Sequence, residues 1–97
     1  MRAMISLCNS LADYDHHYRG VDIHFIKMAD HEQYRAVELE VEAGLYTIRY
    51  MFTYEMLYHT PGHPKEVIKQ YYSEAIQMAH YYIDEHWREY RMHGMGD

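Results

Sequence analysis

The sequence predicts an α+β fold in which a helix, a three-stranded antiparallel sheet and a long C-terminal helix follow in that order (αβββα). Three observations carry this prediction: a strict period of two in one segment, a short glycine turn after it, and a long stretch with helical periodicity. A single layer of helices on one sheet face would bury the apolar sides of these elements. A length of 97 residues predicts one domain, 1–97.

The first helix is expected over residues 3–18, because apolar residues recur there at helical spacing. They are Met4, Leu7, Cys8, Leu11, Tyr14 and Tyr18. Gly20 would end this helix. Alternatively, Ser10 caps a shorter helix that begins at Leu11.

Three strands are expected between residues 21 and 58. They cover Val21–Met28, Tyr34–Ala43 and Leu45–Tyr58. The middle strand is the clearest, because its apolar residues alternate with glutamates and one face should therefore be covered and the other wet. The apolar residues are Val37, Leu39 and Val41, and the glutamates are Glu38, Glu40 and Glu42. Gly44 indicates an antiparallel hairpin, in which Arg49 lies near the glutamates while most of their charge stays unneutralised.

The long helix is expected from His63 to His93, with Pro64 in its first turn and glycines after its end. Its length would be roughly 45 Å, which is more than short strands can cover. We therefore expect either a break near Ala79–Ile83 or an overhang of the last turns.

Charge and composition limit the classes of partner. The net charge is −6, and the segment from Asp13 to Glu42 carries eight acidic residues against three basic ones, a net charge of −5. This distribution argues against direct binding of nucleic acid and favours a protein partner with a basic surface. The single cysteine excludes an internal disulfide, and no segment is long and apolar enough to span a membrane, so a cytoplasmic protein is expected.

Two families share features with this chain. The order helix, three strands, helix resembles double-stranded RNA-binding domains, but only Lys65 and Lys69 stand where those domains carry a basic cluster, so RNA binding is not expected. The size, acidity and mixed α/β order are similar to those of some small viral anti-CRISPR inhibitors. That resemblance implies a stoichiometric inhibitor of a defence protein, which would act in the cytoplasm of the host.

Two surfaces are candidates for partner binding. Glu38, Glu40 and Glu42 repeat roughly every 6.5–7 Å along their strand, a spacing comparable to that of phosphates in one nucleic-acid strand. Such a row could imitate a nucleic acid and dock on a basic surface. The second surface is the distal helix end, where aromatic residues would be exposed if the helix overhangs the sheet, and where two copies could form a homodimer. Its members are Tyr82, His86, Trp87 and Tyr90.

Nine histidines and twelve tyrosines permit an alternative, a metal- or small-ligand-binding protein, with its site in a pocket of one chain or at a homodimer interface. The residues His86, Glu89 and His93 share one helix face and could bind a transition metal, and so could the pair His59 and His63. No phosphate loop, nucleophile elbow or cysteine pair is present. We therefore predict a non-enzymatic protein without a cofactor, which inhibits or regulates a protein partner.

Overall fold

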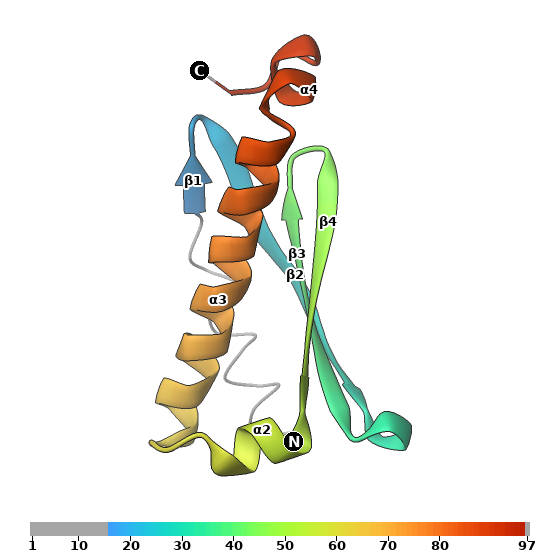
Figure 1. The fold of residues 1–97 in the computed structure, drawn as a ribbon, viewed down its shortest axis with the longest axis vertical. Coiled ribbons are helices and arrows are strands. Elements are labelled where there is room, and N and C mark those ends of the chain that lie inside the picture. Colours follow the sequence, from blue (N-terminus) through green and yellow to red (C-terminus); the bar gives the residue numbers. More distant parts are fainter. Residues whose placement is uncertain (1–15, 97) are drawn as a thin grey trace.

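The structure of the protein is a computed structural model that describes residues 16–96. Four strands form one antiparallel sheet in the order β1-β2-β3-β4, and three α-helices follow them in the chain (Figure 1). The strands are β1 (His16–Tyr18), β2 (Val21–His31), β3 (Ala36–Ala43) and β4 (Tyr46–Thr53); a 3-10 turn, η2 (Glu32–Tyr34), joins β2 to β3; the helices are α2 (Tyr54–His59), α3 (Pro64–Glu85) and α4 (Trp87–Met92). The α+β class is confirmed, but the sheet has four strands rather than three, and α2 and α4 lie at the two ends of α3.

The additional strand replaces the end of the first predicted helix. Residues 3–15 of that helix lie outside the described part of the chain, but His16–Tyr18 forms β1. Arg19 and Gly20 both have positive φ, 52° and 79°, and the tight turn that they form pairs Tyr18 with Val21. The tyrosine then reaches α3, because its hydroxyl donates to Asp84 over 2.9 Å and its ring stacks on His80.

The other strands differ from the prediction mainly at their ends. β2 continues past Met28 to His31, so η2 and Arg35 form the connection to the next strand, which was expected over residues 29–33. β4 ends at Thr53 rather than at Tyr58, because the Thr53 hydroxyl accepts a hydrogen bond from the backbone N–H of Met56 (3.1 Å) and thereby caps α2. The predicted hairpin is confirmed, and it pairs Arg49 with Glu40.

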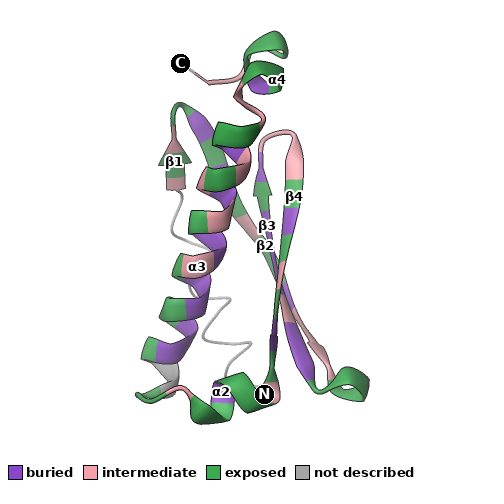
Figure 2. Ribbon diagram, viewed as in Figure 1, coloured by how far each residue is buried: buried purple, intermediate pink, exposed green. Residues whose placement is uncertain are grey.

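The long helix breaks at His86, later than the expected break at 79–83. This residue leaves helical geometry (φ −112°, ψ 24°), and α4 continues in a new direction (Figure 1). α3 packs across the sheet, with its buried residues on the side that faces the strands (Figure 2). The buried core residues of α3 are Val67, Ile68, Tyr71, Tyr72, Ala75, Ile76, Ala79 and Ile83. Within residues 16–96, none of the helices combines the length and apolar character needed to cross a membrane.

Candidate functional site

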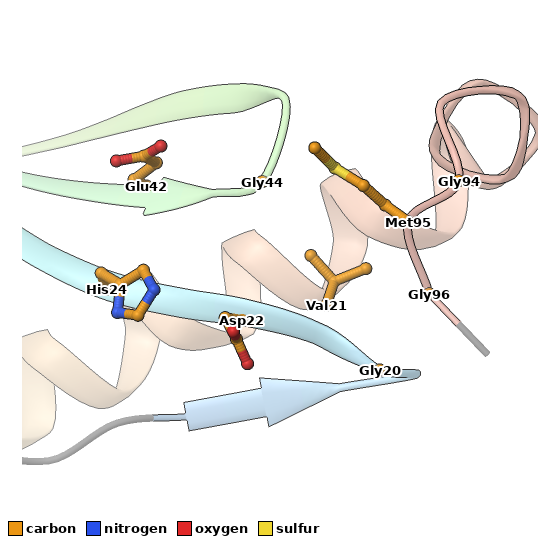
Figure 3. A pocket seen from close by; sticks show the side chains of 9 residues that line it. All are labelled: Gly20, Val21, Asp22, His24, Glu42, Gly44, Gly94, Met95 and Gly96. Carbon is orange, nitrogen blue, oxygen red and sulfur yellow. The ribbon is translucent and has the colours of Figure 1, made fainter.

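A cleft opens where the β1–β2 and β3–β4 turns meet the C-terminal segment Gly94–Gly96 (Figure 3). We call it the turn-end cleft. It has a volume of about 430 Å³, within the range of small-ligand sites. Its lining residues are Gly20, Val21, Asp22, His24, Glu42, Gly44, Gly94, Met95 and Gly96. Of the predicted partner-binding residues, Glu42 is in this lining, whereas the distal helix end contributes only the segment Gly94–Gly96 that follows it.

Glycine shapes one wall of this cleft. Gly44 has φ 60° in the turn between β3 and β4, and a Cβ atom there would lie 2.8 Å from Cε1 of Tyr90. Any side chain at this position would thus collide with an aromatic ring that is itself fully buried. The Met95 side chain reaches towards Gly44 from the C-terminal segment (Figure 3).

Tyr90 fixes α4 to the end of the sheet. Its hydroxyl donates to the carbonyl oxygen of Ala43, and its own carbonyl oxygen accepts from the N–H of Met95 over 2.8 Å. Burial raises the pKa of Tyr90, so its hydroxyl remains a hydrogen-bond donor at neutral pH. The backbone of Ala43 on one side of the cleft and that of Met95 on the other are therefore held by one residue, the first through its side chain and the second through its carbonyl oxygen.

Trp87 supports the other side of the cleft. The guanidinium of Arg19 lies 3.7 Å from the centre of its ring, a cation–π contact between the β1–β2 turn and α4. Gly96 packs against the same ring, since a Cβ atom at Gly96 would lie 2.6 Å from Cη2 of Trp87. The C-terminal segment thus has two aromatic anchors, both from α4.

The distal helix end is consequently not the exposed aromatic patch that the sequence suggested. Tyr90 has 0% exposure, while Tyr82, His86 and Trp87 are only partly exposed. The ring of His86 lies 4.5 Å from that of Tyr46, whose hydroxyl donates to Glu89 over 2.5 Å. This hydrogen bond lowers the pKa of Glu89, so the carboxylate stays ionised. After the break at His86, Tyr90 and Trp87 contact the end of the sheet. Tyr82 and His86 lie against the ring of Tyr46.

The glutamate row is also different from the expected wet, unneutralised face. Glu40 is only 7% exposed, and its carboxylate lies 2.9 Å from Nε of Arg49 and 3.8 Å from Nζ of Lys27. Glu38 lies 2.9 Å from Nε2 of His31 and 3.5 Å from Nε of Arg49. Glu42 is exposed and faces the cleft. The prediction of a mostly unneutralised row is therefore wrong for two of its three members, because β2 and β4 place cationic side chains beside them.

The electrostatics of the cleft are acidic. Among the described lining residues, two carry carboxylates, Asp22 and Glu42, and one carries an imidazole, His24, which pairs with Glu42 across β2 and β3. No lysine or arginine is among these lining residues. Asp22 also lies 2.5 Å from Nδ1 of His17, but both side chains are exposed and a carboxylate can accept further hydrogen bonds.

The proposed metal ligands do not converge. His86 Nδ1 and Glu89 lie 3.6 Å apart, but His93 stands at the exposed C-terminal end of α4. His59 and His63, the other suggested pair, are both exposed beside the loop before α3. In the described part of the chain, no group of three or more histidine, cysteine, aspartate or glutamate side chains could hold a metal ion.

Several cleft residues did not stand out in the sequence. Asp22 and His24 appeared only as the polar half of an alternating strand, and Met95 followed the predicted helix. The available signal was the glycines at 20, 44, 94 and 96, each of which marks a turn or a chain end. Their meeting in one place depends on the direction of α4 after His86, which periodicity does not encode.

No protein-family model, curated protein or solved structure matches this chain. The function of the turn-end cleft is therefore inferred from the chemistry of its own residues.

Proposed function

We propose that this protein is a non-enzymatic binding protein that acts stoichiometrically on a protein partner, and that its turn-end cleft receives a basic side chain of that partner. The observation that carries this proposal is the pair of carboxylates, Asp22 and Glu42, in a cleft whose described lining includes no lysine or arginine. Arginine is the best-matched guest, because its planar guanidinium offers five N–H donors for carboxylates and backbone carbonyls. Gly94 leaves its backbone open to such a guest, because a Cβ atom added there would meet nothing within 4 Å.

The cleft is better suited than the glutamate row to bind a basic side chain, because two glutamates of the row already form ion pairs. Glu38 and Glu40 already lie beside Arg49 of their own chain, so binding a basic partner there would require exchanging one ion pair for another. Such an exchange contributes little net free energy at a partly exposed site. Glu42, together with Asp22, presents its charge without that competition from lysine or arginine in the lining.

A peptide titration tests the chemistry directly. We would add acetyl-Gly-Arg-Gly-amide to ¹⁵N-labelled protein and follow the backbone amide signals, with acetyl-Gly-Gln-Gly-amide as the uncharged control peptide. The arginine peptide should shift the signals of Asp22, His24, Glu42, Gly44 and Gly96, and the glutamine peptide should not. Added salt should weaken the shifts, because the carboxylates are open to solvent.

Two double variants test whether the shifts of the amide signals arise from binding in the cleft. The double variant Asp22→Asn/Glu42→Gln should lose them, whereas Glu32→Gln/Glu66→Gln removes two exposed carboxylates outside the lining and should retain them. The same two variants would then be compared in capturing partner proteins from host extract. Equal shifts with both peptides, or equal binding by both double variants, would refute the cleft as a site for basic side chains.

A further inference from the structure

The two edges of the sheet differ greatly in length. Within residues 16–96, β1 has three residues, and Tyr18 and Arg19 tie this edge to α3 through Asp84. β4 has eight residues, and among the described strands it has a neighbour on one side only. Natural proteins usually protect a long edge with lysine, proline or a bulge, because unpaired backbone groups can bind another strand. β4 contains no lysine or proline, and its pairing with β3 has no register shift.

The hairpin geometry determines which backbone groups of β4 face outward. The loop has two residues, Gly44 and Leu45, and it is closed by the pair Ala43 and Tyr46. In a two-residue hairpin the closing pair is hydrogen-bonded, and hydrogen-bonded pairs then alternate along the ladder. The even-numbered residues of β4 therefore bond to β3. The odd-numbered residues, Thr47, Arg49, Met51 and Thr53, direct their N–H groups towards the open edge.

We infer that the β4 edges of two copies of this chain pair antiparallel and join two sheets into one continuous sheet. A two-fold axis at Tyr50 gives a self-complementary register. Arg49 then lies opposite Met51 of the second copy, and Thr47 lies opposite Thr53. Moving the axis to Arg49 would place like charges directly opposite each other, which is destabilising. Moving it to Met51 would shorten the paired segment, because Thr47 would lose its opposite residue.

The charges of the edge are compatible with this pairing. Arg49 is the one charged residue of β4, and Glu40 and Glu38 of its own chain lie 2.9 Å and 3.5 Å from its Nε. Two copies would thus meet without the repulsion that an unpaired arginine would cause. Met51 is 53% exposed and lies beside the axis, where pairing would cover it. The two turn-end clefts would stand at opposite ends of the joined sheet, although the dimer does not depend on the function proposed for them.

The oligomeric state tests the inference. Light scattering coupled to size exclusion should give the dimer mass for wild type at high concentration and a lower mass on dilution. Met51→Lys places a lysine opposite Arg49 of the second copy but beside Glu38 of its own chain, so it should fold and be monomeric. Met56→Lys is the matched control, because Met56 is 43% exposed and lies on α2 rather than β4. It should remain a dimer.

Amide hydrogen exchange of wild type provides a second measurement that needs no variant. In the dimer the N–H groups of Arg49 and Met51 should be as protected as those of Ile48 and Tyr50, and this protection should fall on dilution. A wild-type monomer at all concentrations, or a dimer that Met51→Lys leaves intact, would overturn the inference. Fast exchange at Arg49 and Met51 in a confirmed dimer would place the interface elsewhere and overturn it as well.

Discussion

Leu39 and Glu40 are neighbours in β3 with almost the same exposure, 2% and 7%, but they lie on opposite faces of the sheet. Leu39 belongs to the apolar core beneath α3. Glu40 lies on the open face, where its neighbours are Arg49 from β4 and Lys27 from β2. One residue is therefore covered by a helix, and the other by the side chains of adjacent strands.

Equal burial has different energetic consequences on the two faces. Removing apolar surface from water stabilises the fold by about 25 cal/mol per Å². An ion pair also loses hydration when it is covered, and the attraction between its charges offsets this cost only partly. Arg49 keeps 69% of its side chain exposed, so solvent weakens its attraction to Glu40. We conclude that the helix side supplies most of the stability, while the open face sets the arrangement of charge.

The largest expected loss of stability comes from a substitution on the helix side of the sheet. Leu39→Ala should lower the free energy of unfolding by about 2–5 kcal/mol, because it removes buried methyl groups and leaves a cavity. Urea denaturation followed by circular dichroism would measure this loss. Thr47→Ala, an exposed change on the open face, should stay within about 0.5 kcal/mol of wild type. A loss below about 1 kcal/mol for Leu39→Ala would contradict the comparison of the two faces.

Substitutions on the open face should change the free energy of unfolding less. Glu40→Gln should cost about 1 kcal/mol, and a double-mutant cycle with Arg49→Met should give a coupling of about 0.2–1 kcal/mol that decreases with added salt. Glu40→Leu should stay close to neutral, because it removes the desolvation cost of a buried carboxylate while Arg49 keeps Glu38 and solvent as partners. If Glu40→Leu destabilised the fold as much as Leu39→Ala, the ion pair would contribute much more than its exposure implies.

The sequence predicted those parts of the fold that depend on local periodicity. The alternation in β3 identified its buried residues, and Gly44 identified the hairpin. The ends of the strands were less predictable, because a turn in one place and a helix cap in another interrupted the periodic pattern. The Arg19–Gly20 turn produced β1 within a helical pattern, and the cap at Thr53 ended β4 within an alternating one.

The candidate site was less predictable than the fold. The sequence indicated Glu42 and Tyr90, but it could not show that one lines the cleft while the other is buried as its anchor. Alternation says which side chains share a face, but it does not say which cations the adjacent strands supply. It therefore could not distinguish the paired Glu40 from the exposed Glu42, because both have the same place in the pattern.

The smallest expected change in stability is caused by pH and involves a histidine on the helix side of the sheet. His80 of α3 stacks on Tyr18, and burial lowers its pKa below 6.5; Asp84 opposes this shift, whereas His16 adds to it. The folded state thus binds a proton at His80 less readily than the unfolded state does. The stability that neutral His80 contributes is complete well above pH 6.5 and is lost as the pH falls through the pKa of the folded protein.

Unfolding measurements between about pH 8 and about pH 5 would reveal this loss, and His80→Gln should reduce it. Arg19, which lies 2.8 Å from Asp84, remains charged throughout this range. An NMR titration of the imidazole would give its midpoint directly, and a midpoint at or above 6.5 would contradict the prediction. A midpoint below 6.5 would show that the helix side of the sheet disfavours charge at a site where the ring is only partly buried. The open face, by contrast, accepts a nearly buried carboxylate because cations surround it.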